Sequence, residues 1–470
     1  MIALSLGEVC AAVGGSLHGA GPDAVVTGPV VIDSRLAAPG SLFVAIKGEH
    51  VDGHDFGTAA VGNGTVAVLG ERVVAGVPTV LVVDVVAALG LLARAVLDRL
   101  PGVEVVGITG SSGKTGTKDL VAGLLERTGT TAATRGSFNN EIGLPLTVLE
   151  ADEGTAHLVL EMGARGIGHL RDLTLIAPPN VGVVLNVGSA HLGEFGSRES
   201  IAVAKAELVE ALPADGLAVL NADDPLVAAM AARTGARVVT FGRSAAADVR
   251  AEDVVLEHGR ARFRLSAAEG SADVALALVG AHQVSNCLAA ACVALAAGLP
   301  VDIVAGVLSA AQPRSPWRME VSERPDGVTV VNDAYNANPE SMAAALRTLV
   351  DLGEGRRTWA VLGEMRELGV GGATHHDAIG RLAVRLGVDR LVVVGREARA
   401  MHLGAGLAGG VGTESVFVPD ADAAARLLGA EVAPGDVVLV KASRAAGLER
   451  VAIALLDQLP VLPRVDGPES

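Results

Sequence analysis

The sequence predicts an α/β protein with three domains: a small α/β domain, a central domain built on a parallel sheet with a glycine-rich loop, and a C-terminal Rossmann-like doubly wound domain. Three observations lead to this fold class. The chain has 470 residues, enough for about three domains at roughly 100–200 residues each. Strand-like and helix-like runs alternate along two long stretches, which indicates parallel sheets covered by helices. Pro313 and Pro316 interrupt that alternation, so we expect domains at 1–83, 84–312 and 313–470.

The first stretch, residues 1–83, contains short apolar runs separated by glycine turns, with one or two helical stretches among them. Apolar runs bounded by turn residues are typical of strands. The expected strands are Val26–Ile32, Leu42–Ile46, Val66–Leu69 and Thr79–Val83.

The central stretch, residues 84–312, alternates strands with helices. Its segment Asp248–Leu278 instead has short alternating runs, for which we expect a small antiparallel appendage. The expected strands are Val103–Thr109, His157–Glu161 and Val181–Asn186, and the expected helices are Lys114–Arg127, Gly168–Ile176 and Glu199–Ala211.

Beyond the two prolines the alternation of strand and helix restarts, which predicts a second doubly wound unit. The tail after Pro460 is expected to be frayed. The alternating segments, beginning with a strand, are Val328–Val331, Pro339–Val350, Thr358–Leu362, Thr374–Leu386, Leu391–Val394, Ala421–Leu428, Val437–Val440 and Ser443–Leu456.

Composition narrows the class of partner. The formal net charge is −16, which argues against nucleic acid and anionic membranes, because both attract basic surfaces. A phosphorylated small molecule is compatible with this charge, since loop amides, a few cations and Mg²⁺ can neutralise phosphates locally. The uncharged run Val274–Val301 is broken by Gly280, Asn286 and Pro300, so we expect a strand and a buried helix there rather than an integral membrane contact.

Cysteine usage and the N-terminus bear on the compartment. Cys10, Cys287 and Cys292 show neither a metal-ligand spacing nor a disulfide framework. The N-terminal segment lacks the basic run of a signal peptide. We therefore expect a cytoplasmic protein. We also expect a monomer.

A glycine-rich loop, Gly110-Ser111-Ser112-Gly113-Lys114-Thr115, lies between an apolar strand and a helix. It departs from the common phosphate-loop pattern, which would place a glycine at the position of Ile108. Glycines let successive N–H groups point at one anion, and the following helix adds its free amides. The lysine of such a loop reaches phosphates, and its threonine hydroxyl can bind Mg²⁺. The context favours nucleotide binding over an ordinary turn.

Three further residues follow the next elements of the central sheet, at the edge where ligands bind in open α/β sheets. Glu161 ends one strand, and His191 follows the next. A carboxylate and an imidazole near the loop threonine suit Mg²⁺, the carboxylate better than the imidazole. Lys205 lies on the following helix, where a cation beside metal ions is unexpected. Each residue alone could be an ordinary surface group.

A dense polar cluster, Asn332-Asp-Ala-Tyr-Asn-Ala-Asn-Pro339, follows a strand of the C-terminal stretch. It contains the only tyrosine of the chain, Tyr335. An Asx-rich helix cap would also explain such a cluster. We favour a site, with Asp333 facing ribose hydroxyls. Two further segments, Gly363–Gly369 and Lys441–Arg444, follow strands at the same edge.

Four segments together carry a family resemblance. The sequence is similar to the Mur ligases, ATP-dependent amide-bond enzymes of peptidoglycan synthesis, whose loop typically has the shifted glycine seen here. The likeness covers nearly the whole chain in the family's order. The segments are Ile108-Thr-Gly-Ser-Ser-Gly-Lys-Thr115, Leu160-Glu-Met-Gly163, Ala190-His-Leu192 and Ala204-Lys-Ala-Glu207.

Within the family, further segments resemble the ligase that adds D-alanyl-D-alanine to UDP-N-acetylmuramoyl-tripeptide. The resemblance implies three domains that bind the UDP-sugar, ATP and the incoming amine. It also implies the substrates UDP-N-acetylmuramoyl-tripeptide, D-alanyl-D-alanine and ATP, with Mg²⁺. The segments are Asp33–Arg35, Leu42–Gly48, Asp52–Asp55, Asn139–Gly143, Asp333–Pro339, Gly363–Gly369 and Val440–Arg444.

The resemblance implies a role for each matching residue. The lysine at the position of Lys205 is commonly carbamylated by CO₂, which turns a cation into an anionic oxygen donor for Mg²⁺ and explains the unexpected charge. The implied catalytic residues are Lys114, Lys205, His191 and Arg318; the ATP site is Gly110, Ser111, Ser112, Gly113, Lys114, Thr115, Asn286, Arg318 and Asp333; the metal ligands are Thr115, Glu161, His191 and carbamylated Lys205; and the substrate site is Ser34, Arg35, Asn139, Asn140, Tyr335, Asn336, Asn338, Lys441 and Arg444.

Two departures and several alternatives accompany this interpretation. Gly116 and Ala442 differ from the usual family residues, although neither removes a functional side chain. The ligase that adds diaminopimelate or lysine would more usually carry an Asp-Asn-Pro-Arg-like stretch, which the chain lacks. Folylpolyglutamate synthase lacks a uridine-binding domain such as the Asp33–Arg35 segment implies. A phosphate-loop kinase and a non-catalytic nucleotide-binding module remain more distant alternatives.

Overall fold

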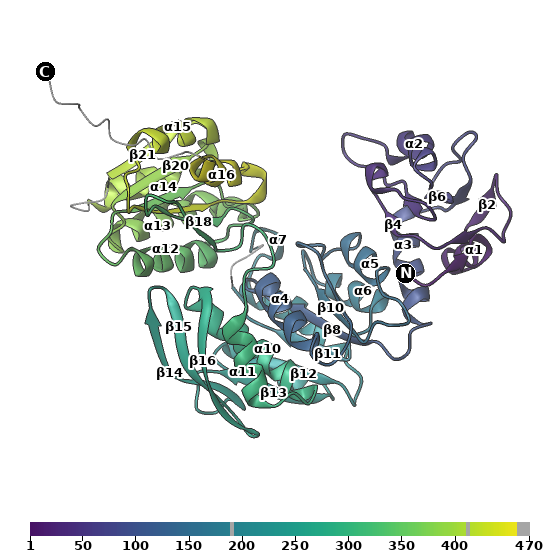
Figure 1. The fold of residues 1–470 in the computed structure, drawn as a ribbon, viewed down its shortest axis with the longest axis horizontal. Helices are drawn as coiled ribbons and strands as arrows, with labels where there is room; N and C mark the ends of the chain where they lie inside the picture. Colours follow the sequence, from purple (N-terminus) through teal and green to yellow (C-terminus); the bar gives the residue numbers. More distant parts are fainter. Residues whose placement is uncertain (189–191, 410–413, 458–470) are drawn as a thin grey trace, which may run out of the picture.

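The computed structural model describes residues 1–188, 192–409 and 414–457. Its described residues form three main sheets of five, nine and six strands, which follow one another along the sequence. The central part lies between the N-terminal part, which is purple in Figure 1, and the C-terminal part, which is green to yellow. The three-domain α/β fold class predicted from sequence is confirmed.

The N-terminal sheet has the strand order β2-β7-β6-β5-β4, parallel except for the β2–β7 pair. Glycine and proline at positions 28 and 29 divide the expected strand Val26–Ile32 into β3 and β4. Helix α1 begins with a capping box in which Ser5 and Glu8 bond each other's main chain. The elements are β1 (Leu4–Ser5), α1 (Leu6–Val13), β2 (Ser16–His18), β3 (Val25–Val26), β4 (Val30–Val31), β5 (Leu42–Val44), α2 (Gly57–Gly62), β6 (Ala67–Gly70), β7 (Thr79–Leu81) and α3 (Val85–Leu97).

Helix α3 connects the first two parts of the molecule. Its residues Leu89, Leu92 and Val96 are fully buried in a hydrophobic cluster that continues from the N-terminal part into the central part. Burial of a side chain of this size stabilises by roughly 1.5–3 kcal/mol. The domain boundaries 1–83, 84–312 and 313–470 remain a prediction.

The central sheet has the order β16-β15-β14-β13-β12-β11-β8-β10-β9. Strand β8 is central, flanked in parallel by β10 and β11, so the loop after it lies at the carboxyl edge between two neighbours. The first elements are β8 (Glu104–Thr109), α4 (Lys114–Leu125), β9 (Thr131–Ala133), α5 (Gly143–Val148), β10 (His157–Glu161), α6 (His169–Ile176), β11 (Val181–Val184), α7 (Leu192–Phe195), α8 (Arg198–Glu210), β12 (Leu217–Asn221), α9 (Pro225–Ala228) and β13 (Arg237–Gly242).

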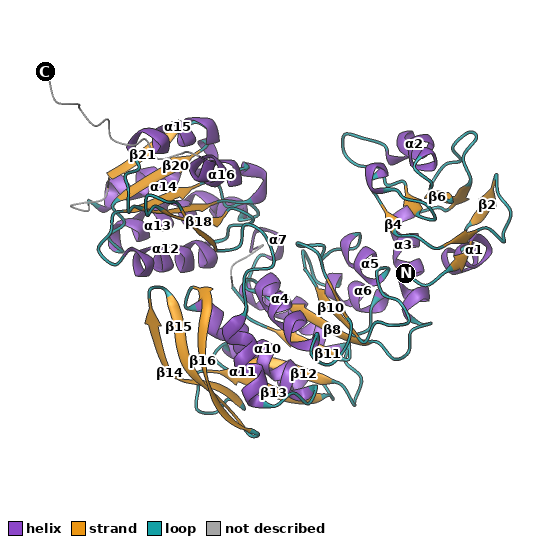
Figure 2. Cartoon of the chain, in the orientation of Figure 1, coloured by secondary structure: helices purple, strands orange, loops and turns teal. Residues whose placement is uncertain are grey.

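The segment expected to be a small appendage extends the central sheet instead. Its strands pair antiparallel with one another, as predicted. The first of them also pairs in parallel with β13 through Phe241–Val249 and Gly242–Arg250, which joins the hairpins to the sheet edge (Figure 2). The expected antiparallel strands are therefore present, and they continue the central sheet. The elements are β14 (Val249–Glu257), β15 (Arg260–Ala267), β16 (Gly270–Val279), α10 (His282–Ala296) and α11 (Val301–Ala310).

The uncharged run Val274–Val301 forms the strand and buried helix that the sequence predicts. Helix α10 packs beside α4, and small residues such as Ala289, Ala290 and Ala291 are fully buried along it. In the described residues, we find no helix with the length and apolar character that a bilayer crossing requires.

The C-terminal sheet has the order β17-β18-β22-β19-β20-β21, parallel apart from the edge strand β17. Helices lie on both of its faces (Figure 2), as a doubly wound fold requires. The elements are β17 (Glu320–Glu323), β18 (Thr329–Asp333), α12 (Pro339–Gly353), β19 (Thr358–Leu362), α13 (Gly372–Arg385), β20 (Arg390–Val394), α14 (Arg399–Ala408), β21 (Glu414–Val418), α15 (Ala421–Glu431), β22 (Val437–Lys441) and α16 (Glu449–Asp457).

Candidate active site

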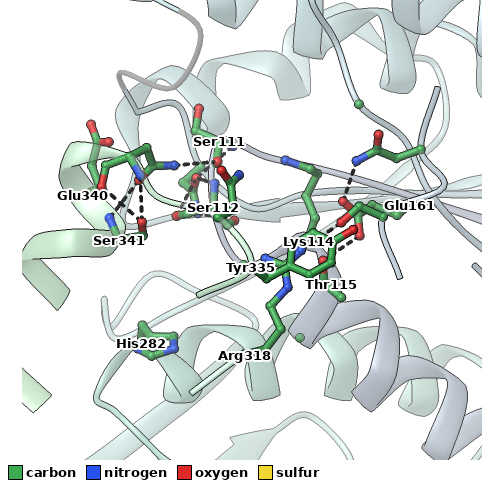
Figure 3. A pocket seen from close by; sticks show the side chains of 18 of the residues that line it. Ser111, Ser112, Lys114, Thr115, Glu161, His282, Arg318, Tyr335, Glu340 and Ser341 are labelled. Carbon is green, nitrogen blue, oxygen red and sulfur yellow. Dashed lines mark hydrogen bonds between the residues drawn. The ribbon is translucent and has the colours of Figure 1, made fainter. Parts of the chain in front are cut away.

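A cavity of about 510 Å³ opens between the central and C-terminal parts. The carboxyl edges of both parallel sheets contribute to it, through the loop after β8, the end of β10 and the ends of β18 and β22. Figure 3 shows Lys114, Thr115 and Glu161 gathered at one end, with Ser111 and Ser112 beside them. Most of the predicted site residues line this one space.

The glycine-rich loop is held in shape by Asn186, which follows β11. Its Oδ1 accepts hydrogen bonds from the N–H groups of Ser111 at 3.1 Å and Ser112 at 3.0 Å, and its Nδ2 donates to the Ser112 carbonyl at 3.1 Å. The first amides of the loop are thus bonded to protein. The groups left for an anion are the N–H groups in the first turn of α4, which have no intrahelical partner.

The turn into α4 requires a glycine at position 113. Its φ is +83°, and a Cβ there would lie 2.5 Å from Oδ1 of Asn286 on α10. Asn286 is buried, and its Nδ2 donates to Oε1 of Gln283 at 3.0 Å. The predicted adenine-binding residue therefore lies directly against the loop.

Lys114 begins α4 and folds back over the loop. Its Nζ donates to the Gly110 carbonyl at 2.7 Å. Burial lowers the pKa of Lys114; the carboxylate of Glu161 opposes this shift, and the charge of Arg318 adds to it. Burial is the main cause of the shift, so an anionic ligand beside Nζ would stabilise the charged ammonium.

A chain of hydrogen bonds aligns the predicted metal-binding oxygens. The Thr115 hydroxyl donates to Oε2 of Glu161 at 2.7 Å, and Asn139 Nδ2 donates to Oε1 at 2.7 Å. Glu161 is 2% exposed. Asn139 and Asn140, predicted to bind substrate, both line the cavity, and Asn140 also caps α5 through the N–H of Gly143 at 2.9 Å.

Lys205 is buried in α8 and does not line the cavity. Burial lowers its pKa well below the usual range, and the charge of Lys114 lowers it further. His191 lies outside the described residues, and the described residues contain no group of three or more His, Cys, Asp or Glu residues that could hold a metal ion.

The C-terminal part contributes a buried ion pair. Lys441 Nζ donates to Oδ2 of Asp333 at 2.6 Å and to the Asn336 carbonyl at 2.8 Å. Asp333 Oδ1 accepts from the Met319 N–H at 3.1 Å. The sequence assigned Asp333 to ribose and Lys441 to substrate, whereas in the structure the two side chains are bonded to each other.

Two contacts connect the C-terminal part to the central part across the cavity. Asn338 caps α12 through the Ser341 N–H at 2.8 Å, and its Nδ2 reaches the Ser111 carbonyl at 3.4 Å. Arg318 Nη2 donates to the Ser137 hydroxyl at 2.8 Å. The Nε of Arg318 is buried, and we find no hydrogen-bond partner for it among the described residues.

Tyr335 and Arg444, both predicted to bind substrate, line the cavity near this arginine. The guanidinium of Arg318 lies over the Tyr335 ring, 4.2 Å from its centroid (Figure 3). That of Arg444 lies over Trp317, 4.4 Å from its ring centroid.

The predicted uridine-end residues lie in the N-terminal part, away from this cavity. Ser34 is buried, and its carbonyl accepts from Asn63 at 3.0 Å. Arg35 is exposed and pairs with Asp33 at 2.6 Å. The guanidinium of Arg35 lowers the pKa of the Asp33 carboxyl to about 2.

Sequence reasoning missed residues of the site such as Asn186, Ser137 and His282, and it also missed Trp317, which stacks on the cavity residue Tyr335. His282 lines the cavity, its buried Nδ1 has no hydrogen-bond partner among the described residues, and burial lowers its pKa. The end of a strand next to the loop strand is a position where Asn186 could have been suspected. Nothing in the local pattern indicates the other three.

Comparisons with known proteins agree with this arrangement. Three family models match in order: "Mur ligase family, catalytic domain" over residues 29–96, "Mur ligase middle domain" over 108–294, and "Mur ligase, glutamate ligase domain" over 317–444. The last match begins at residue 317, directly before Arg318.

Individual relatives span nearly the whole chain. A UDP-N-acetylmuramoyl-tripeptide–D-alanyl-D-alanine ligase of Mycobacterium bovis is 50% identical, covering 97% of this chain and 98% of that protein. The Escherichia coli enzyme of the same name is 35% identical, covering 97% of this chain and 99% of that protein.

Solved structures show the same fold. MurF from Acinetobacter baumannii superposes with a TM-score of 0.86 at 30% identity, covering 97% of this chain and 100% of that one. MurF ligase from Thermotoga maritima, solved in complex with ADP, superposes with a TM-score of 0.78 at 35% identity, covering 91% of this chain and 97% of that one. With its loop, its cavity and these matches taken together, the chain belongs to the Mur ligase family.

Proposed function

We propose that this chain is an ATP-dependent, ADP-forming ligase that joins D-alanyl-D-alanine to UDP-N-acetylmuramoyl-tripeptide in peptidoglycan precursor synthesis. The proposal draws its specific substrates from relatives of that name, which are up to 50% identical across almost the full chain. A kinase or a non-catalytic nucleotide-binding module would not need two parallel sheets to present polar groups to one cavity.

One observation carries the chemical part of the proposal: the position of Arg318. It comes from the C-terminal part, bonds Ser137 in the central part, and keeps a buried Nε without a partner among the described residues. The charge of Arg318 also lowers the pKa of Lys114, so the two cations share one electrostatic environment. Two cations from different domains suit a transferring phosphoryl group, whose negative charge both would stabilise.

The reaction has two steps. The terminal carboxylate oxygen of the tripeptide attacks the γ-phosphorus of ATP, the bond to the ADP oxygen breaks, and an acyl phosphate forms. The amine of D-alanyl-D-alanine then attacks the acyl carbon, a proton leaves the nitrogen, and inorganic phosphate departs. Phosphorylation is needed because a carboxylate would otherwise have to expel oxide.

The chain's own groups would hold the reactants. The free amides at the start of α4 and the Lys114 ammonium would bind phosphates, and Arg318 would neutralise the γ-phosphate. Asn286 would meet adenine, and Tyr335, Asn336 and Arg444 would face the acceptor and the amine. Asp333 and Lys441, bonded to each other, would present a fixed polar surface to ribose.

The donors of the site fit Mg²⁺. Thr115 supplies a hydroxyl and Glu161 a buried carboxylate, both oxygen ligands of the kind Mg²⁺ takes. The lowered pKa of Lys205 favours the free amine that reacts with CO₂, so a carbamate there would add a further oxygen donor. Bound Mg²⁺ would neutralise phosphate charge while the residues above orient the ATP.

The remaining proposals concern the other domains and the location. Ser34 and Arg35 would bind the uridine diphosphate end. Cys287 and Cys292 are buried free thiols, and burial raises their pKa above the usual range, which suits a cytoplasmic protein. We further propose a monomer.

The test measures the phosphate that is released from ATP in a mixture with Mg²⁺, UDP-N-acetylmuramoyl-tripeptide and D-alanyl-D-alanine. Each component is omitted in turn. The proposal predicts release only when all are present, and a product heavier than the tripeptide by the dipeptide less one water. Lys114→Ala protein is the control for contaminating activity.

Other outcomes would assign a different activity. Release with the muramoyl dipeptide and a single amino acid would mean that this is the preceding ligase. A phosphorylated acceptor without a new amide would mean that it is a kinase.

A further inference from the structure

Four side chains around the interdomain linker form a continuous run of stacked contacts. Arg444 lies over Trp317 at 4.4 Å from guanidinium carbon to ring centroid, the Trp317 and Tyr335 rings stack at 6.5 Å between centroids, and Arg318 lies over Tyr335 at 4.2 Å. The interplanar angle of the two rings is 29°. Cation–π and aromatic contacts at these separations are attractive.

The main chain around Arg318 has an uncommon conformation. Trp317 has a φ of +58° and Met319 a φ of +49°, both in the left-handed region that non-glycine residues rarely occupy. Three hydrogen bonds offset that cost: Trp317 N–H to Glu320, Met319 N–H to Asp333, and Tyr335 N–H to the Trp317 carbonyl. The turn therefore projects Arg318 in one direction out of the linker.

The arginine itself has few polar anchors. Its Nη2 bonds Ser137, its Nε has no partner among the described residues, and Tyr335 covers its plane. A long, half-buried arginine would otherwise sample many rotamers, at a substantial entropic cost on binding. The contact with Tyr335 is the restraint that orients the guanidinium, and Trp317 in turn stacks on Tyr335.

We propose that Trp317 is a positioning residue for Arg318: through Tyr335 it fixes the guanidinium that faces the γ-phosphate, and its contact with Arg444 connects that guanidinium to the amine side of the cavity. The inference rests on the proposed function in one respect, that Arg318 addresses the γ-phosphate. The run extends from the nucleotide end to Arg444, so occupancy at one end can influence the other.

The experiment measures nucleotide affinity of the full-length chain by titration calorimetry, with ADP and with a non-hydrolysable ATP analogue, both with Mg²⁺. Trp317→Leu removes the ring stack. We expect it to weaken binding of the ATP analogue about tenfold, a value within the range for losing one aromatic pair, because the Tyr335 ring under Arg318 loses its stacking partner. The affinity for ADP should change less than about twofold. Only the analogue carries the phosphate that Arg318 addresses.

Three further variants sharpen this test. Trp317→Phe keeps an aromatic face and should bind the analogue within about threefold of the parent chain. In an Arg318→Ala background, Trp317→Leu should lower the affinity for the ATP analogue by less than a further factor of about two, because its effect depends on the arginine. Tyr335→Leu breaks the same run at the next contact and must reproduce the selective loss.

Phe417→Leu is the matched control. Phe417 lies under Arg399 at 5.8 Å in the same domain but does not line the cavity, so its loss should affect neither nucleotide. Loss of ADP and analogue affinity to an equal extent in Trp317→Leu would overturn the proposal, as would an equal loss in the Arg318→Ala background. Because the cycle needs only nucleotides, it can succeed or fail independently of whether the chain forms an amide.

Discussion

Asn186 is predicted to organise the glycine-rich loop, and Asn186→Ala tests this role. The side chain bonds two N–H groups and one carbonyl of the loop residues Ser111 and Ser112. With alanine the loop loses these three side-chain bonds, although the Ser111 N–H keeps its 3.1 Å bond to the main-chain carbonyl of residue 186, and the sheet beneath the loop stays intact. ATP would then have to bind a loop that occupies its binding conformation only part of the time, which lowers the apparent affinity by that fraction.

The magnitude follows from the three lost bonds. Each hydrogen bond contributes about 1 kcal/mol net, so the loop conformation loses about 3 kcal/mol if no water replaces the amide, equivalent to roughly a hundredfold in ATP affinity. Water that satisfies two of the groups would reduce the loss to about 1 kcal/mol, or roughly fivefold. We therefore expect the KM for ATP to rise between about fivefold and a hundredfold.

The assay is steady-state phosphate release with ATP varied, together with thermal unfolding of each variant. Asn180→Ala is the matched control, because Asn180 accepts a bond from the Val105 N–H at the opposite end of the same two strands. It should lower the unfolding temperature and leave the KM for ATP unchanged. A KM for Asn186→Ala within about twofold of the parent, in folded protein, would refute the reasoning.

Three other predictions follow from the structure. CO₂-depleted protein should lose activity that bicarbonate restores, because the lowered pKa of buried Lys205 favours the free amine that reacts with CO₂. Lys205→Arg protein should show no such recovery, and mass spectrometry would detect the adduct. Gly369→Ala should lower kcat by about tenfold or more without unfolding, since a Cβ there would lie 2.7 Å from the Cα of Gly193 across the domain interface; an unchanged kcat would contradict this contact. The hydrogen bonds from His54 lower the pKa of the Asp52 carboxyl from 3.8 to about 2. The ionised carboxylate therefore stabilises the fold fully above pH 3.8, and this stabilisation is lost as the pH falls toward 2. In calorimetry, the unfolding temperature of Asp52→Asn should fall less over this pH range than that of the parent protein.

The core of the fold could be predicted because its elements have strong local signals. The apolar strands around the loop, such as Val103–Thr109, are buried on both faces and contain few polar residues, as parallel strands do. Helix α14 was missed, since its glycines disfavour a helix and tertiary packing, chiefly against α13, stabilises it. The pairing of β13 with β14 consists of two residue pairs, which are too few to leave a pattern in the sequence.

The residues of the site likewise fall into those with a local sequence signal and those set by tertiary contacts. Lys114, Thr115 and Glu161 follow motifs whose spacing is local, so they could be placed before the structure was known. Asn186 acts through a side chain that crosses to a neighbouring strand, and Trp317 acts through a ring that stacks on Tyr335, beyond the next two strands of the chain. Such contacts depend on tertiary geometry, which a sequence pattern of one element does not contain.

The most direct measurement of the central claim follows oxygen atoms from the acceptor carboxylate. UDP-N-acetylmuramoyl-tripeptide labelled with a heavy oxygen isotope in its terminal carboxylate is converted with ATP, Mg²⁺ and D-alanyl-D-alanine, and the released phosphate is analysed by mass spectrometry. The acyl-phosphate route predicts that one labelled oxygen appears in each phosphate formed. Unlabelled phosphate beside a labelled product would contradict carboxylate phosphorylation at this cavity.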